Sequence, residues 1–378
     1  MSFLLSSFYF FYFSVVGVYI IFMPKVLSSV GYSAEEIGII FAAGPLVRFI
    51  LPMLFTRGLK VSRKIFNSAL IIMVVSSISF YFSIHNFYML LISNIFLGAG
   101  LSLIHPSIEV VSLSTIGKQR YGKIRLFGSL GFVLVALVLV KFLTSPEVAL
   151  NFLLSLTLTT AIVSFVIMTR VDKLQEKKAE TLTNDIALFK AWQLWLGLIF
   201  MQLSFGAFYN FFTIYATDHG ISLDVTIYLW SVGVGAEIVM LFYQGKFLKD
   251  NLLFILQLTT LLTALRWFLV FMFSDNLLVL YFSQTIHAFS FALFHSAAIA
   301  YLYNFYKNKV LAQQFFSGIT YGLGGLLGSL LSGYIYENYP EYLFLSSALV
   351  AFGAFVFISM WRRKREREVF LGANSQKI

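Results

Sequence analysis

Long apolar segments, separated by short polar connections, follow one another along the whole chain. Most of them contain the ~20 residues that a helix needs to cross the hydrocarbon core of a bilayer. The pattern therefore predicts an all-α integral membrane protein with twelve transmembrane helices, arranged as two six-helix bundles. The predicted helices span residues 3–27, 34–56, 66–84, 87–114, 124–144, 148–169, 192–217, 225–244, 251–273, 277–303, 310–336 and 342–361.

The longest polar connection divides these helices six and six. Residues 170–190 (RVDKLQEKKAETLTNDIALFK) mix both signs of charge and have no apolar periodicity. We therefore predict four parts, as in transporters built from two half-bundles. These are an N-terminal bundle over 1–170, a cytoplasmic linker over 171–190, a C-terminal bundle over 191–362 and a cytoplasmic tail over 363–378.

Composition and charge agree with a membrane location. Of the 378 residues, 59% are hydrophobic and 12% are charged, whereas soluble domains contain about 25% charged residues. If both termini are cytoplasmic, 23 of the 27 Lys and Arg residues fall in the inner connections and the tail. The positive-inside rule therefore predicts a multi-pass protein of the cell (inner) membrane with both termini in the cytoplasm. The formal charge of +10 then reflects topology, and no nucleic-acid partner is expected.

Two charged side chains interrupt the apolar pattern of the second half. Glu237 is the only charge between residues 228 and 244, and Arg266 is the only mid-span charge of the next segment. A bare carboxylate near the middle of a bilayer costs at least ~2.5 kcal/mol. Glu237 therefore requires a partner charge, a proton or a water-filled cavity, and such groups commonly mark a transport pathway. The chain is predicted to be a transporter.

The first half contains comparable residues. Arg48 lies inside an apolar segment, and three settings are open to it: the inner interface reached by snorkelling, a structural ion pair, or the cavity. His105 and Glu109 are four residues apart and share one face of a helix. Arg125 begins the next, antiparallel helix. Glu109 and Arg125 form either a structural ion pair or a clamp for the carboxylate or hydroxyl groups of a substrate.

Polar and aromatic groups of other segments are further candidates. Tyr12 and Tyr19 are candidate substrate contacts because aromatic rings line ligand pockets, although rings at this density are also typical of lipid contact. Asn210 is the one strongly polar mid-span side chain of its helix. His287 and His295 lie in one segment. A histidine in a membrane helix either hydrogen-bonds a neighbouring helix or serves as a proton relay or cavity ligand.

The sequence contains no motif for catalysis, nucleotide binding or metal binding. The glycine-rich stretch at 322–325 lies inside an apolar helix without a preceding strand, so it lacks the context of a dinucleotide fingerprint. No Walker A sequence occurs, and the chain has no cysteine. We therefore expect no enzyme activity, no metal and no cofactor, with a proton gradient as the source of energy.

Several stretches are similar to known proton symporters. FYFFYFSVVGVYIIFMP and IGIIFAAGPLVRFILPMLFTRGLKVSRK resemble the first helices of major facilitator superfamily symporters on the lactose-permease side, and YGKIRLFGSLGF resembles their helix 5 entry. YLWSVGVGAEIVM, ALRW and QTIHAFSFALFH look closest to the phenylpropionate permease family. The likeness covers nearly the whole chain in order. It implies alternating access between two six-helix bundles, with the substrate held near mid-membrane.

The resemblance also implies roles for individual residues. Glu109 and Arg125 match the substrate-binding acid and arginine of the lactose-permease pattern. Glu237 matches the acid that links substrate recognition to protonation there. Arg266 and His287 match the arginine and histidine of its coupling network.

Two positions depart from that pattern. Ser290 stands where the lactose permease has a proton-carrying glutamate, three residues past the histidine. Thr56 stands where the superfamily has an acid in the loop after helix 2. If protons are coupled, the resemblance therefore implies that coupling rests mainly on Glu237 with His287, and that the contact of this loop is altered.

The predicted function is proton-coupled import of a small organic substrate, such as an aromatic acid similar to phenylpropionate, by a monomer in the lipid bilayer. Import is implied by the resemblance alone. A sugar or nucleoside is the rival substrate, because Glu109 accepts hydrogen bonds from hydroxyl groups and repels a carboxylate. A receptor or membrane-embedded enzyme is the rival from another class, but the sequence contains neither a reactive constellation nor a large soluble face.

Overall fold

The structure of the protein is a computed structural model. Every regular element among its described residues is a helix. The predicted linker over 171–190 lies almost wholly outside the described residues, and its last part is the 3-10 turn η2 (Leu188–Ala191). The described residues are 1–56, 61–171, 188–249 and 251–375.

The first half contains long helices that each cross the bundle once. Its elements are α1 (Ser2–Gly17), η1 (Val18–Phe22), α2 (Met23–Val30), α3 (Ala34–Thr56), α4 (Arg63–Ser83), α5 (Phe87–Ile116), α6 (Lys118–Phe142) and α7 (Pro146–Thr169). The π-helical segment η1 joins α1 to α2, so these three elements form one continuous crossing.

The second half repeats this plan with more interruptions. After η2 its elements are α8 (Trp192–Ser204), α9 (Gly206–Asp218), α10 (Leu223–Tyr243), η3 (Gln244–Lys246), α11 (Leu252–Met272), α12 (Leu277–Thr285), η4 (Ala288–Leu293), α13 (Phe294–Phe305), α14 (Lys309–Phe315), η5 (Phe316–Gly324), α15 (Gly325–Asn338), η6 (Pro340–Tyr342) and α16 (Leu343–Ser375). The π-helical segments η4 and η5 each lie within one crossing.

The prediction of twelve transmembrane helices is confirmed. Among the described residues, eleven continuous helical stretches are long and apolar enough to cross a membrane. The twelfth crossing is α3, whose 23 residues begin with the charged Glu35 and Glu36 and include Arg48. The helix predicted over 124–144 begins earlier, because α6 starts at Lys118.

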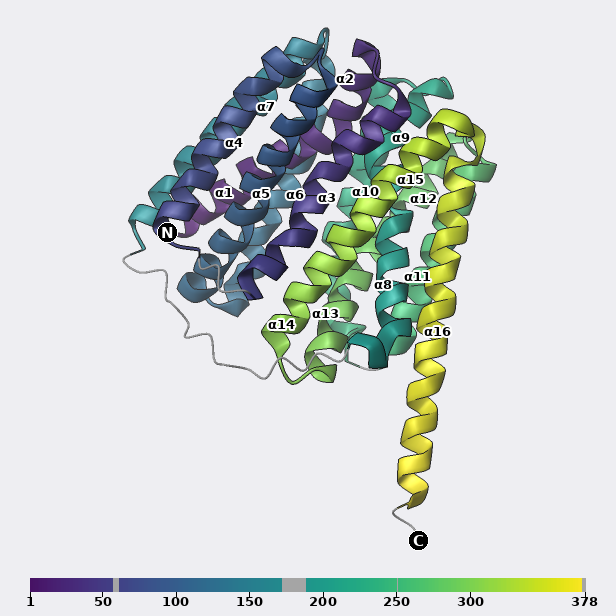
Figure 1. Cartoon of the computed structure of the whole chain (residues 1–378). Coiled ribbons are helices and arrows are strands. Elements are labelled where there is room, and N and C mark those ends of the chain that lie inside the picture. The colour runs from purple at the N-terminus through teal and green to yellow at the C-terminus, as the bar shows by residue number, and fades with distance from the viewer. Residues whose placement is uncertain (57–60, 172–187, 250, 376–378) are drawn as a thin grey trace.

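The last helix is longer than its apolar segment. Its predicted end is residue 361, but α16 continues to Ser375 through a stretch that the pattern assigns to a tail. Arg362 pairs with Glu366 and Arg365 pairs with Glu368 along this stretch. Such pairs, three or four residues apart, stabilise a helix outside an apolar environment. Figure 1 shows this end of α16 projecting beyond the bundle.

Polar side chains determine where several helices begin. At six helices of the described chain, a Ser or Asn side-chain oxygen accepts a hydrogen bond from the backbone N–H three residues further on, as N-cap residues do. Each cap satisfies one of the donors that the first turn leaves unpaired. The capping residues are Ser62, Asn86, Ser222, Asn251, Asn276 and Asn308.

The two halves pack against each other along α3 and α15, which lie side by side in Figure 1. A Cβ atom on Gly38 would lie 2.7 Å from the carbonyl oxygen of Ser329 and 2.9 Å from Cα of Gly333. Further along, a Cβ atom on Gly322 would lie 2.6 Å from the backbone nitrogen of Phe49. Helix backbones approach this closely only where side chains are small. The glycines of this seam therefore serve in packing.

Polar contacts between the halves gather at one end of the bundle, beside the turn between α2 and α3. The ammonium group of Lys25 lies 3.7 Å from the carboxylate of Asp218. The backbone N–H of Ala34 donates to the carboxylate of Glu337 at 2.6 Å. Within the described chain, no ion pair or polar hydrogen bond joins the halves at the opposite end. We therefore call the end with Lys25 and Asp218 the sealed end.

Replacing Gly38 with alanine is expected to weaken the sealed end. The added methyl group would lie within 3.0 Å of backbone atoms of α15. These atoms cannot turn aside as a side chain does, so α3 and α15 must separate. Because the chain has no cysteine, spin labels on Ser29→Cys and Tyr339→Cys report the distance between the halves at this end. We expect a longer mean distance in the Gly38→Ala protein.

Gly44→Ala on the same helix is the matched control, because a Cβ atom there meets nothing within 4 Å. This variant should keep the distance of the parent protein. If the Gly38→Ala distance were also unchanged, the close contact at Gly38 would have no part in closing this end.

Candidate functional site

Three charged or titratable residues form a chain of contacts inside the second half. Oε2 of Glu237 lies 3.7 Å from Nε2 of His287. Nδ1 of the same ring lies 2.9 Å from a terminal nitrogen of Arg266. Glu237 and Arg266 are thus connected through the imidazole and not by a direct ion pair. Arg266 is fully buried and the side chain of Glu237 is 16% exposed, so both lie within the bundle.

Arg266 determines which nitrogen of His287 holds a proton in this arrangement. A guanidinium group has only hydrogen-bond donors, so Nδ1 of His287 must accept and the ring proton is on Nε2. The Nε2–H group faces the carboxylate of Glu237. A second proton on His287 would have to face the N–H of Arg266. Glu237 is therefore the member of this chain that can gain and lose a proton without breaking it.

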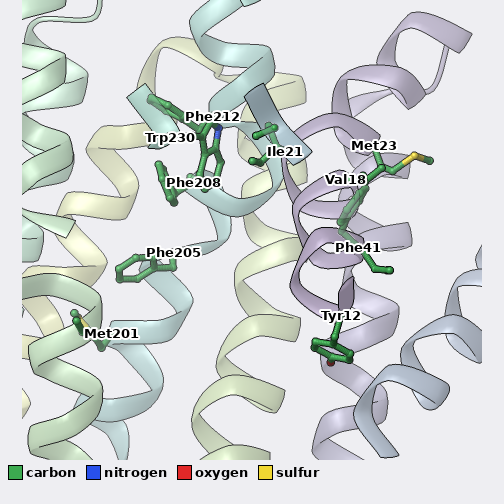
Figure 2. Packing of buried hydrophobic residues seen from close by; sticks show 14 of the residues in the cluster. Tyr12, Val18, Ile21, Met23, Phe41, Met201, Phe205, Phe208, Phe212 and Trp230 are labelled. Atoms are coloured by element: carbon green, nitrogen blue, oxygen red, sulfur yellow. The ribbon is translucent and has the colours of Figure 1, made fainter. Parts of the chain in front are cut away.

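The guanidinium group of Arg266 is held by rings and neutral polar groups. Its central carbon lies 4.4 Å from the ring centre of Phe208 and 4.3 Å from that of Trp267, a geometry that cation–π attraction stabilises. One terminal nitrogen donates to Gln284 at 2.8 Å, and the other lies 3.3 Å from the hydroxyl of Ser290. Figure 2 shows Phe208 within the group of buried rings of this half.

Both departures from the symporter pattern lie in described helices. Ser290 is buried in η4, three residues after His287. Its hydroxyl accepts the long hydrogen bond from Arg266 and donates a longer one, of 3.5 Å, to the backbone oxygen of His287. Among the described residues, Glu237 is the only acid within 4 Å of this chain of contacts. Thr56 is the last residue of α3, and the loop that follows lies outside the described residues.

In the first half, Glu109 and Arg125 belong to one cluster but have separate partners. The hydroxyl of Tyr121 donates a hydrogen bond to Glu109. The guanidinium carbon of Arg125 lies 4.0 Å from the ring centre of Phe13 and 5.6 Å from that of Tyr9. The direct Glu109–Arg125 ion pair, one of the two predicted arrangements, is absent from the described contacts. Each group remains available to a further partner.

Three other predicted residues of the first half are held by hydrogen bonds or ring contacts. The hydroxyl of Tyr12 donates to the backbone oxygen of Leu101 at 3.2 Å, and the Tyr12 ring lies 4.9 Å from that of His105. The hydroxyl of Tyr19 donates to Asn94 at 2.8 Å. Tyr12 and His105 thus lie beside the Arg125 cluster, whereas Tyr19 joins η1 to α5.

The remaining candidates belong to the second half. The amide of Asn210 donates to the hydroxyl of Ser329 at 2.8 Å, and both residues are buried. This contact joins α9 to α15. Nδ1 of His295 lies 2.6 Å from the hydroxyl of Tyr321. Neither Asn210 nor His295 contacts the Glu237 chain directly, and a role for either in substrate binding stays a prediction.

Arg48 lies close to the middle of α3 and is exposed. It forms no ion pair within the described chain. Its positive charge acts on Tyr12 and His105 of the first half and on Tyr209 and Tyr321 of the second half. Arg48 is therefore close to polar groups from both halves.

Sequence reasoning missed several groups that contact the predicted residues. Tyr121 lies four residues before Arg125, and this one-turn spacing is a signal that could have found it. Gln284 was not missed: it lies three residues before His287, and the sequence places both on one face of a helix, whereas its bond to Arg266 comes only from the structure. No spacing distinguishes Phe208 from the many other aromatic residues of its segment, so only the packing identifies it.

A family model supports the same fold. The model of the MFS_1 like family matches residues 3–346. The chain belongs to this family. It is therefore a membrane protein of the secondary-transporter class. A curated relative from Escherichia coli (strain K12), described as a probable 3-phenylpropionic acid transporter, is 24% identical over 92% of this chain and 94% of its own length. The uncharacterized transporter YwbF of Bacillus subtilis (strain 168) is 23% identical over 88% and 86%.

Solved structures of other transporters have the same fold. A mutant form of the nucleoside transporter NupG superposes with a TM-score of 0.79 at 18% identity and covers 95% of this chain and 99% of its own. A POT family peptide transporter superposes with a TM-score of 0.77 at 10% identity, with 96% of each chain covered. At these identities the likeness concerns the fold alone.

Replacing Gln284 with leucine should destabilise the protein more than replacing Ser290 with alanine. Gln284→Leu removes the acceptor of a buried guanidinium nitrogen, which costs about 1–3 kcal/mol. Ser290→Ala removes only the longer bond of a nitrogen that keeps its contact with His287. Thermal unfolding in detergent should give the lower Tm for Gln284→Leu. Equal Tm values would mean that Gln284 does not hold Arg266.

Proposed function

We propose that the protein is a symporter that imports an aromatic monocarboxylate together with a proton. The E. coli relative, a probable 3-phenylpropionic acid transporter, supports this substrate class. The charges inside the bundle are the observation that carries it. Three arginines and two glutamates lie there, and with neutral histidines one positive charge is left unbalanced. These residues are Arg48, Arg125, Arg266, Glu109 and Glu237.

This imbalance favours an anionic substrate. An unpaired charge in a low-dielectric interior is costly, and a bound anion reduces the cost. With no ligand, the interior carries one net positive charge. With the substrate anion and a proton on Glu237 bound together, it again carries one. Either ligand alone changes that value. The empty and fully loaded forms therefore reorient with equal internal charge, which couples the substrate to the proton.

Glu237 is the proposed proton site, and an electrostatic interaction with the first half supports this role. The charge of Arg125, which belongs to the first half, acts on Glu237 in the second half. A nearby positive charge favours the ionised form of a carboxylate. When the halves rearrange, the separation of Arg125 and Glu237 changes. The affinity of Glu237 for a proton then depends on the conformation, as coupled transport requires.

The proposed direction, import, follows the family resemblance, and the charge distribution supplies the orientation of the chain. Most Lys and Arg residues lie in connections on the side of the two termini, and that side is cytoplasmic under the positive-inside rule. The sealed end then faces outward.

Glu237→Gln is expected to abolish accumulation driven by a pH gradient while counterflow of the substrate continues. Glutamine keeps the size of the side chain but does not bind a proton at physiological pH. Uptake of radiolabelled 3-phenylpropionate into proteoliposomes, with and without an imposed pH gradient, measures both. Glu341→Gln, which removes an exposed carboxylate outside the bundle interior, is the matched control. Normal accumulation by Glu237→Gln would exclude Glu237 as the proton site.

Transport is also expected to be electroneutral, because one proton accompanies one monoanion. A membrane potential imposed with potassium and valinomycin should leave the initial rate of 3-phenylpropionate uptake nearly unchanged. Symport of a proton with a neutral sugar or nucleoside moves net charge and responds to the potential. If uridine or lactose competed for uptake and the rate responded to the potential, the substrate would be a nucleoside or sugar and not an aromatic acid.

A further inference from the structure

Arg48 is the interior arginine whose donors are least engaged. Arg266 bonds to His287 and Gln284, and Arg125 stacks on Phe13. Arg48 has no hydrogen bond, ion pair or stacked ring among the described residues. All five N–H donors of its guanidinium group are therefore open to a ligand.

The direction of Arg48 on α3 follows from helix geometry. Each residue turns the helix by about 100°, so Arg48 lies about 20° from Phe41 and about 40° from Gly44. Both of those residues face the bundle: the Phe41 ring lies 4.8 Å from that of Tyr19, and the backbone of Gly44 packs against Gly98.

The lipid-facing side of the same helix lies elsewhere. Ile39 and Ile50 are 39% and 42% exposed, and they lie about 180° and about 160° from Arg48 round the helix. The exposed surface of Arg48 therefore faces the inside of the bundle. Of the three predicted settings, the cavity fits this geometry, whereas snorkelling along the lipid face does not.

Arg48 is also deep in the membrane. It follows the start of α3 by fourteen residues, or about 21 Å at ~1.5 Å per residue, in a hydrocarbon core of about 30 Å. At the centre of a span a charged arginine costs at least ~2.5 kcal/mol. Water and a passing anion reduce this cost, whereas a purely structural role gives no reason to leave the group unpaired.

The charge at this position reaches groups of both halves. The charge of Arg48 acts on Tyr12 and His105 and, across the interface, on Tyr209 and Tyr321. These rings offer a surface for an aromatic substrate. The next residue along α3 packs against η5, the segment that contains Tyr321. A ligand on Arg48 would thus lie where the halves meet.

We infer that Arg48 forms a carboxylate-binding subsite, in which its guanidinium group holds the substrate's carboxylate through two parallel hydrogen bonds while the aromatic ring lies among the tyrosines of both halves. Planar, bidentate pairing of this kind is specific to arginine. Arg125, already stacked on Phe13, would then contribute positive electrostatic potential and part of the wall of the site, but not the main contact with the carboxylate. This inference rests on the proposed function, because it names the residue that recognises the acid.

The first test compares an acid with its neutral analogue. Equilibrium binding of 3-phenylpropionate and of 3-phenylpropionamide is measured on purified parent protein, Arg48→Gln and Arg48→Lys. We expect Arg48→Gln to lower the affinity for the acid by about 30-fold or more, as truncation of a desolvated charge pair does. Arg48→Lys should lose less affinity for the acid, because lysine keeps the positive charge but not the planar pair of N–H donors. The affinity for the amide should change little. Lys64→Gln, which removes an exposed charge of the same half, should bind the acid normally.

A second test does not depend on how well each variant folds. Because the chain lacks cysteine, Arg48→Cys can be purified once and then modified with either a positively charged or a neutral methanethiosulfonate reagent. The positive adduct should bind 3-phenylpropionate at least about tenfold more tightly than the neutral one, as expected for a restored ion pair. Bound acid should also slow the modification itself.

The outcomes separate this inference from the proposed function. If the parent protein binds the acid and Arg48→Gln binds it equally well, Arg48 is not the subsite and the proposed function stands. If the parent protein binds and transports no aromatic acid, the proposed function fails, and the subsite fails with it. Equal binding by the two cysteine adducts would also overturn the assignment of Arg48.

Discussion

The low dielectric of the membrane interior is the constraint on which the rest of the structure depends. An ionised group that is buried away from water inside the bundle must be compensated locally. Arg266 lies against two aromatic rings and donates to Gln284. Glu109 accepts a hydrogen bond from Tyr121, and Arg125 lies over Phe13. These three groups thus have partners within their own half, so each half can move as a unit without exposing them to lipid.

The contact between the halves is built differently. It consists of close backbone packing at glycines such as Gly38 and Gly322, with a few polar contacts at the sealed end, including Lys25 with Asp218. Contacts of this kind bury little charge and break without leaving an ionised group in hydrocarbon. The polar networks thus lie within each half, whereas small residues pack between the halves. This division suits a protein of the MFS type, in which two bundles must part and close repeatedly.

Charge inside the bundle links this architecture to the proposed substrate. The positive charges are not fully compensated, since the arginines exceed the glutamates by one. Arg48 is the group that remains open, and it lies on α3 beside the seam and near tyrosines of both halves. A carboxylate bound there would neutralise the excess at the place where closure occurs. Glu237, on the other side of the interface, returns the balance when it takes up a proton.

The sequence by itself determined the number and approximate limits of the helices, because membrane thickness requires about 20 apolar residues for each crossing. It also singled out Glu237, Arg266 and His287, since charged and titratable groups are rare in such segments. Only the tertiary structure decided their partners: His287 bridges Glu237 to Arg266, and Glu109 pairs with Tyr121. The physical reason is that lipid and bundle core are both apolar. Periodicity therefore does not reveal which face of a membrane helix points inward, and the rotation of each helix is set by packing against its neighbours.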